Sequence, residues 1–297
     1  MQNPLTSVLL IVLTALAGGA SACAVLALRR RAADDRWLQR GVIGLLTGAT
    51  LGSAVLFVLR ALLLHKGFHP LTAHVDGLLL IAALLGAGLL FLRARPRLEG
   101  VAAFGLPLLT LILAWAICAS AWTYHPFKTS PGLDPAWKAI HLGGVYVGTF
   151  CAALGAALGA MFLYVRRRLR LKQQLATLPR LASLESLESL IVRATVLGFA
   201  LLTLGLVSGL VLQPAHSSLG PGWWHHPKVV LSTAAWLAYA LLLNVRFTRS
   251  FRGARAAWLA IAGFVLLLAT YGVITAMPSQ AAAAPPPAAP PAAEVSP

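Results

Sequence analysis

Histidine is the residue type in this 297-residue chain that could most directly do chemistry. The chain has eight, at His65, His69, His74, His125, His141, His216, His225 and His226. Imidazole is the commonest side-chain metal ligand and also ligates haem iron. Histidine is equally tolerated at wet interfaces, so a single one of them indicates little and the whole set indicates more.

A second candidate feature is the segment 213–228, which ends in the run Gly220, Pro221, Gly222, Trp223, Trp224, His225, His226, Pro227 and Lys228. Adjacent tryptophans beside an apolar segment are typical of anchors at a membrane interface. They could also form a flat aromatic shelf for a planar ligand, with a neighbouring histidine binding iron and Lys228 meeting a carboxylate of that ligand. Both interpretations can hold together.

Asp76 is an acidic residue within an apolar stretch. Acidic residues inside membrane spans usually face a polar cavity or a charged partner. Arg60, about one turn inside the preceding apolar segment, is the obvious partner. A structural ion pair and a ligand contact both remain open for Asp76.

The sequence gives little indication of cysteine chemistry or of a catalytic motif. Cys23, Cys118 and Cys151 lie inside apolar segments, without a CxxC pair or metal-ligand spacing. The sequence has no HExxH, no phosphate-binding Gly-rich loop and no recognisable nucleophile, base and orienting group. We therefore expect that the protein is not an enzyme.

The elements that position these residues can be predicted from composition. Hydrophobic residues make up 59% of the chain and charged residues 11%, and the mean hydropathy is +0.80. A helix needs about 20 apolar residues to cross a bilayer. Eight segments qualify, near residues 5–28, 41–64, 71–92, 101–122, 141–165, 190–212, 229–245 and 256–277. We predict an all-α, polytopic transmembrane helix bundle over residues 1–279, followed by a disordered Ala/Pro-rich tail, 280–297.

The basic residues predict how this bundle is oriented. Of the 24 lysines and arginines, 19 fall in one set of alternate loops and four in the other. Cytoplasmic loops carry the excess, so both termini are predicted to face outward (N-out/C-out), with all eight histidines on or near the outer face. The net charge of +16 is spread over short clusters, which favours a lipid bilayer as partner and gives no indication of nucleic acid.

The segment 178–189 has apolar residues every third position, with Glu185 and Glu188 between them. This pattern predicts an amphipathic helix lying on the cytoplasmic surface.

Several stretches resemble a known family. They are Gly67, Pro70, Leu71 and Asp76 at a predicted external turn, His141 in WKAIHLGGVYVGTF, and the runs ESLIVRATVLGFALLTLGLVSG, HHPKVVLSTAAWLAYALLL and FRGARAAWLAIAGF. In this order and spacing they resemble the cytochrome c assembly protein family of CcsA- and CcmC-like haem-handling membrane proteins. The resemblance covers most of the chain from the second helix onward, and is closest to the small eight-helix branch related to HemX and YpjD.

The chain departs from the family pattern at several positions. The family segment resembles WxWDPKE, and aligned on residues 227–228 this chain has His226, His225 and Val229 at its Asp, second Trp and Glu. Asn244 stands where such members carry a histidine, and the further histidine before the last helix is absent. The resemblance therefore implies one haem site and not a two-site relay.

For that site the resemblance implies haem b, with His141 and either His226 or His225 as ligands of the iron. Trp223 and Trp224 would form the shelf, and Lys228 and Asp76 would complete the cofactor-binding set.

We expect an accessory protein of cytochrome c assembly in the bacterial inner membrane, with the histidine-rich face periplasmic. It would hold haem there and present it to cytochrome c biogenesis proteins. The alternative is a HemX-like regulatory or scaffolding protein, serving tetrapyrrole synthesis or metal transport without stable haem binding, whose working surface is the basic stretch 166–172. Transport is the weakest hypothesis, because the spans offer almost no polar groups at the membrane midplane.

Overall fold

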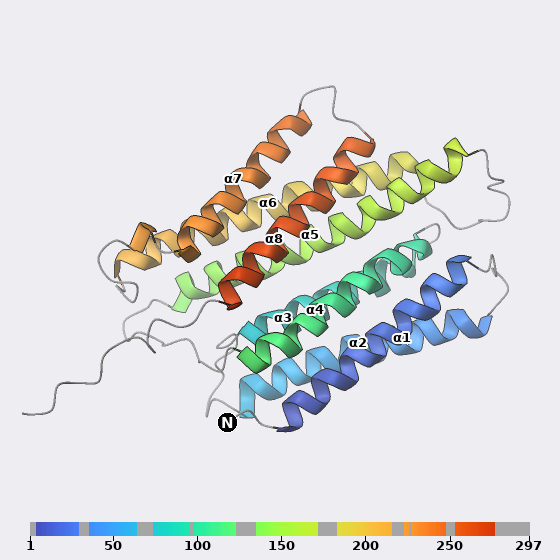
Figure 1. Cartoon of the computed structure of the whole chain (residues 1–297), viewed down its shortest axis with the longest axis horizontal. Helices are drawn as coiled ribbons and strands as arrows, with labels where there is room; N and C mark the ends of the chain where they lie inside the picture. The colour runs from blue at the N-terminus through green and yellow to red at the C-terminus, as the bar shows by residue number, and fades with distance from the viewer. Residues whose placement is uncertain are drawn as a thin grey trace, which may run out of the picture.

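The chain folds as a bundle of α-helices. The computed structural model describes residues 4–29, 36–63, 74–95, 98–122, 135–171, 183–215, 223–225, 227–247 and 253–276. Its helices are α1 (Pro4–Arg29), α2 (Arg36–Leu63), α3 (His74–Arg93), α4 (Ala102–Trp122), α5 (Pro135–Arg170), α6 (Leu184–Ala215), α7 (Pro227–Phe247) and α8 (Ala254–Ala276), with the short 3₁₀ helices η1 (Glu99–Val101) and η3 (Trp223–His225) (Figure 1). These ranges contain no strand, so the predicted all-α class is confirmed.

Seven of these helices, α1 to α6 and α8, are long and apolar enough to cross a membrane. A helix pairs its own backbone polar groups, which is why such segments are stable in lipid. The chain is therefore a multi-pass membrane protein. That α7 also crosses, and that both termini face outward, stay predictions.

α5 and α6 extend furthest beyond the predicted spans. α5 begins with Pro135, a favoured first helical residue, and continues into its arginine-rich end. α6 begins at Leu184, where the hydroxyl of Ser183 accepts a hydrogen bond from the backbone N–H of Ser186 at 3.2 Å. Residues 184–189 are thus the first turns of α6 and not part of a separate surface helix, which corrects that prediction. Residues 178–182 and the tail 280–297 lie outside the described ranges.

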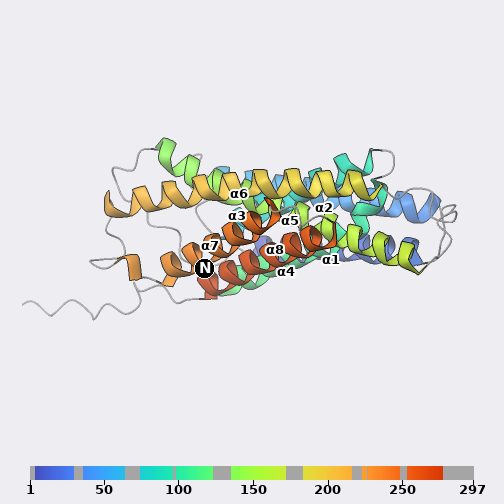
Figure 2. The same ribbon diagram turned by 90° about the horizontal axis from the view of Figure 1, so that it is seen from above.

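The helices form two groups that meet along α5. Figure 1 shows α1 and α2 at one edge of the bundle and α7 at the other, and Figure 2 shows the helices running along its long dimension. α5 packs against α3, α4, α6 and α8. The shared core includes the fully buried Leu79, Leu85, Leu106, Leu113 and Met161. α5 is therefore the helix that joins the two groups through a common core.

The backbones of α5 and α6 approach each other closely. A Cβ atom added at Gly144 would lie 2.7 Å from the carbonyl oxygen of Leu201, and one added at Gly205 would lie 2.8 Å from Cγ2 of Val145. Small residues let helix backbones approach in membranes, where packing and not the hydrophobic effect drives association. This contact brings the backbone of α6 within reach of side chains on the first turns of α5.

Candidate functional site

A cavity of about 150 Å³ lies between α3, α4, α5, α6, α7 and α8. Its walls are mainly aliphatic and aromatic side chains. No lysine, arginine, aspartate or glutamate is among the lining residues in the described part of the chain. Such a cavity suits an apolar ligand, and the few polar side chains at its surface decide what else that ligand can be.

His141 is the strongest Lewis base that lines this cavity. The Nδ1 atom of its ring lies 2.6 Å from the carbonyl oxygen of Gly205 on α6. A carbonyl oxygen only accepts hydrogen bonds, so Nδ1 carries the proton and donates, which leaves the lone pair on Nε2. This is the arrangement in which metal-ligating histidines are commonly held, with the second ring nitrogen bonded to a carbonyl or carboxylate.

The orientation of the His141 ring is also fixed by packing. A Cβ atom added at Gly209 would lie 2.7 Å from Cε1 and 2.9 Å from Nδ1 of the ring. The ring therefore rests against the bare backbone of α6, one helical turn beyond the carbonyl it bonds. Any side chain larger than hydrogen at this position would push the ring away.

The other hydroxyls in the cavity wall are partly used within their own helices. Thr149 donates to the carbonyl of Val145 at 2.7 Å, and Thr270 donates to that of Leu266 at 2.9 Å. Ser232 on α7 also lines the cavity. The lining thus combines one histidine with few other polar groups.

Two aromatic residues on α7, Trp236 and Tyr239, line the same cavity. Both stack on Phe199 of α6, with ring centroids 5.7 Å and 6.0 Å apart and interplanar angles of 19°. The indole Nε1–H of Trp236 donates to the hydroxyl of Thr203 at 2.9 Å. Neither residue was predicted from the sequence. The one indication there is that they lie three positions apart on a predicted helix, and therefore on the same side of it.

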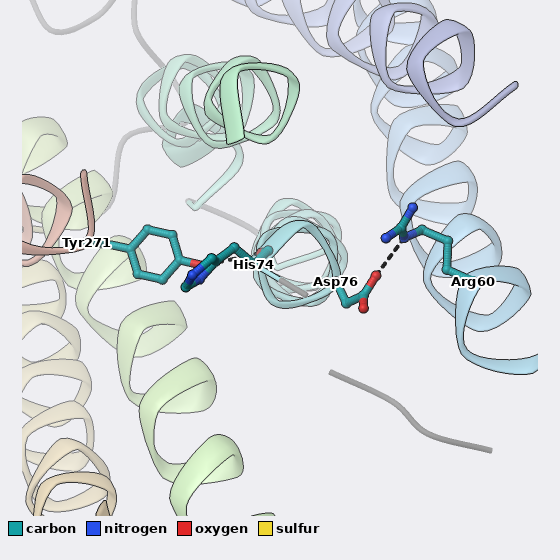
Figure 3. A network of polar contacts seen from close by, with 4 residues as sticks. All are labelled: Arg60, His74, Asp76 and Tyr271. Carbon is teal, nitrogen blue, oxygen red and sulfur yellow. Dashed lines mark hydrogen bonds and ion pairs between the residues drawn. The ribbon is translucent and has the colours of Figure 1, made fainter. Parts of the chain in front are cut away.

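Asp76 takes part in an ion pair and does not line the cavity. The guanidinium Nε of Arg60, in the last turn of α2, donates to Oδ1 of Asp76 at 2.6 Å. Figure 3 shows the two side chains facing each other between α2 and α3. Of the two interpretations left open by the sequence, the structural ion pair is the one present.

The opposite side of α3 faces α8. The hydroxyl of Tyr271 donates to the backbone carbonyl of His74 at 3.2 Å, and the two rings meet edge to face at 5.8 Å (Figure 3). The hydroxyls of Tyr271 and Tyr146 are hydrogen-bonded, and the Tyr146 phenol lies directly over Gly77. Tyr271 also lines the cavity, so the hydrogen bond of its hydroxyl to His74 connects the α8 wall of the cavity to α3.

The external tryptophan segment is only partly described. In η3 the Trp224 ring is 63% exposed and packs on His225, with centroids 4.3 Å apart. Neither residue is among the described residues that line the cavity. Lys228 opens α7, but its side chain and that of Trp223 lie outside the described part, as do His226 and four other histidines: His65, His69, His125 and His216.

The structure therefore brings His141 together with Trp236, Tyr239 and Tyr271, and not with Trp224 or His225. Pairing of His141 with His226 on one iron stays a prediction. Within the described ranges, no group of three or more His, Cys, Asp or Glu side chains could hold a bare metal ion.

Comparison with known proteins shows which family this chain resembles. The family model described as cytochrome C assembly protein matches residues 71–278, from just before α3 to just after α8. The cavity and the α5–α6 contact lie within the matched region. No solved structure matches the chain.

Curated relatives agree with that match. The cytochrome c biogenesis protein CcsA of Prochlorococcus marinus strain MIT 9312 is 26% identical over 229 residues, which cover 69% of this chain and 72% of the relative. That of strain MIT 9303 is 30% identical over 197 residues, covering 58% and 61%. That of Porphyra purpurea is 27% identical over 244 residues, covering 69% and 75%.

Proposed function

The chain belongs to the cytochrome c assembly protein family, and from that premise we propose that it is a haem-binding accessory protein of cytochrome c assembly. It holds haem b near the periplasmic face of the bacterial inner membrane and presents it to other cytochrome c biogenesis proteins. We propose a binding role for the chain and no catalysed reaction.

One observation carries this proposal. His141 lines an apolar cavity, and its Nδ1 atom is bonded to the Gly205 carbonyl at 2.6 Å. A neutral imidazole with a fixed tautomer and an available Nε2 is the form of histidine that binds haem iron. An apolar surrounding also suits the porphyrin ring, which is mostly hydrocarbon.

The lining also restricts how haem could be held. Haem carries two negatively charged propionates, and no cationic side chain is among the described lining residues. Burying unpaired charges in an apolar site is costly. The proposal therefore has the propionate edge toward the water-facing end of the cavity, where Lys228 at the start of α7 is a candidate partner. The hydrocarbon edge of the ring is directed into the bundle, toward His141.

The test is an absorption spectrum of the detergent-purified full chain, oxidised and reduced, after haem is supplied. Wild type is expected to show a Soret band and, when reduced, defined α and β bands. His141→Ala is expected to lose most of the bound haem. His225→Ala separates two models, because it changes the spectrum only if the exposed His225 shares the iron.

A wild-type chain that stays haem-free would contradict the proposal. The regulatory or scaffolding alternative would then gain support from the end of α5, where Arg167 and Arg170 are exposed on a helix that continues to Arg170. A basic helical end of this kind could engage an acidic partner or anionic lipid.

A further inference from the structure

The cavity beside His141 has the size of one small ring. Its volume is about 150 Å³, and an apolar cavity of about this volume takes up one benzene-sized molecule. The lining includes Leu78 of α3, Ile112 of α4 and Phe264 of α8. A neutral ligand of this size that dissolves in the bilayer suits such a cavity, whereas a charged ligand would lose its hydration without gaining a partner.

One edge of the His141 ring is turned away from α6. Nδ1 donates to the carbonyl oxygen of Gly205 at 2.6 Å, and a Cβ atom added at Gly209 would lie 2.7 Å from Cε1 but 3.6 Å from Nε2. The edge formed by Nδ1 and Cε1 thus rests on α6, and Nε2 lies on the farther side of the ring. No residue in the described part of the chain forms a hydrogen bond with Nε2. Because Nδ1 carries the proton, Nε2 can only accept one.

Most other polar groups in the cavity wall already donate within the protein. Four donors are used in this way: the hydroxyls of Thr149, Thr270 and Tyr271 and the indole of Trp236. Ser232 adds a hydroxyl that can donate or accept. A ligand that brings a donor therefore finds an acceptor in Nε2 of His141, while a ligand that brings only an acceptor finds these four donors occupied.

We propose that this cavity binds a small neutral ring that carries one hydroxyl group, a phenol or a cyclic alcohol, and that the hydroxyl donates to Nε2 of His141. The ring fills the apolar space. A buried acceptor that lacks a donor is costly, so the hydroxyl gives this ligand an advantage over a hydrocarbon of equal size. Binding does not require haem and goes beyond the function proposed above. In that function the iron would use the same nitrogen, so the two ligands exclude each other.

The experiment titrates the detergent-purified full chain, without haem, with para-fluorophenol and para-fluorotoluene. These probes differ only in a hydroxyl group and a methyl group of similar size, and fluorine NMR measures the saturable binding of each. The ratio of their two affinities is compared between variants, because partition of each probe into detergent is the same in every sample. Cyclohexanol and cyclohexanone, which are similar in size, are then compared as competitors of bound para-fluorophenol.

Three variants locate the site. His141→Phe keeps a ring but removes both nitrogens. Ala235→Leu adds bulk inside the cavity, since Ala235 lines it and is 3% exposed. Ala234→Leu is the matched control, because Ala234 is the neighbouring residue of α7 and is exposed. Helix content and thermal midpoint are measured for each variant.

Wild type is expected to bind para-fluorophenol about fivefold more tightly than para-fluorotoluene, which is the size of one hydrogen bond. His141→Phe should bring this ratio close to one. Ala235→Leu is expected to weaken both probes by about tenfold or more, because the added atoms occupy the space of the ring, and Ala234→Leu should match wild type. Cyclohexanol should displace para-fluorophenol at a lower concentration than cyclohexanone does.

Several outcomes would overturn the inference. Absence of saturable binding in wild type, or equal affinities in Ala235→Leu and Ala234→Leu, would remove the cavity as the site. An unchanged ratio in His141→Phe would remove the contact with Nε2. If His141→Phe does not fold, equal displacement by cyclohexanol and cyclohexanone in wild type would overturn the preference for a hydroxyl.

A haem titration of the same preparation separates this inference from the proposed function. A chain that binds para-fluorophenol but no haem would contradict the function and leave the inference standing. A chain that binds haem but neither fluorinated probe would do the reverse. If both bind, para-fluorophenol is expected to lower the apparent affinity for haem more than para-fluorotoluene does, and equal effects of the two probes would count against a shared nitrogen.

Discussion

The ring of His141 on α5 is bonded through Nδ1 to the carbonyl oxygen of Gly205 on α6, at 2.6 Å. The two residues are 64 positions apart in the chain. The contact depends on the close approach of two helix backbones, because a glycine contributes no side chain that could reach out. The tautomer and the ring orientation of His141 are therefore set by the packing of α5 on α6.

The packing of His141 on α6 predicts a specific effect of Gly209→Ala. The new methyl group would lie 2.7 Å from Cε1 of the ring, so the imidazole must move and its bond to Gly205 must lengthen. We expect haem affinity to fall by about tenfold or more, with a shifted Soret band, in a spectral titration. Gly143→Ala is the matched control, since a Cβ there meets nothing within 4 Å. Equal affinities for the two variants would count against a ligand role for His141.

Breaking the ion pair between Arg60 and Asp76 should destabilise the bundle. In Asp76→Ala the guanidinium keeps its charge but loses its partner, and the side chain of Arg60 is only 15% exposed. We expect a loss of about 3 kcal/mol in unfolding free energy, seen as a lower thermal midpoint in detergent. The double variant Arg60→Met with Asp76→Leu should recover much of it, because no charge is then left unpaired. If the double variant were less stable than Asp76→Ala, the pair would not be the cause.

The helix interface between α5 and α6 should be sensitive to Gly144→Ala. The added methyl group would lie 2.7 Å from the carbonyl oxygen of Leu201 and 2.8 Å from the nitrogen of Gly205, which are backbone atoms that cannot turn aside. We expect destabilisation of about 1–3 kcal/mol together with weaker haem binding, because the Gly205 carbonyl is displaced from His141. Gly155→Ala is the control, as its nearest contact of 3.6 Å is ordinary. Thermal unfolding and haem titration of both variants check this.

Tyr271→Phe separates the two roles of Tyr271. It removes the hydroxyl that bonds the carbonyl of His74 at 3.2 Å but keeps the ring in the cavity wall. We expect a stability loss of about 1 kcal/mol and nearly unchanged porphyrin affinity. Tyr164→Phe removes a hydroxyl at the other end of the bundle, where it is bonded by Arg168, and serves as control. A large loss of porphyrin affinity in Tyr271→Phe alone would instead assign the hydroxyl to the ligand.

The predicted orientation can be checked by cysteine labelling in cells. The three native cysteines are first replaced by alanine or serine, and single cysteines are then introduced as Trp224→Cys in η3 and Arg170→Cys at the end of α5, both exposed positions. A maleimide that does not cross membranes is expected to label the first in intact spheroplasts and the second only after the membrane is opened. The reverse pattern would invert the topology and remove the periplasmic site from the proposal.

The fold class and one contact could be predicted from the sequence because they depend on local properties. The length and apolarity of a segment decide whether it crosses a membrane, and neither depends on its neighbours. The pairing of Asp76 with Arg60 was also foreseeable. The two charges lie near the facing ends of consecutive helices, where each is the nearest available partner of the other.

The start of α6 was not accessible in this way. The apolar period of residues 184–189 continues without a break into the following span, so the pattern could not distinguish a separate surface helix from the first turns of a longer one. The structure decides this through packing. Leu187 is fully buried, and Glu188 accepts a hydrogen bond from the backbone N–H of Gly253 at 3.2 Å, which ties these turns to the start of α8.

The composition of the candidate site was decided by tertiary structure alone. From the sequence, His141 was predicted to be an iron ligand, and the aromatic shelf was assigned to Trp223 and Trp224, because those two residues are adjacent to other histidines in the chain. In the fold, Trp236 and Tyr239 share the cavity with His141, since the rotation of α7 against α6 and α8 turns that face inward. The rotation of a helix about its axis is set by side-chain packing across several helices. A segment that is apolar on nearly all sides has no distinct apolar face, so its sequence does not predict this rotation.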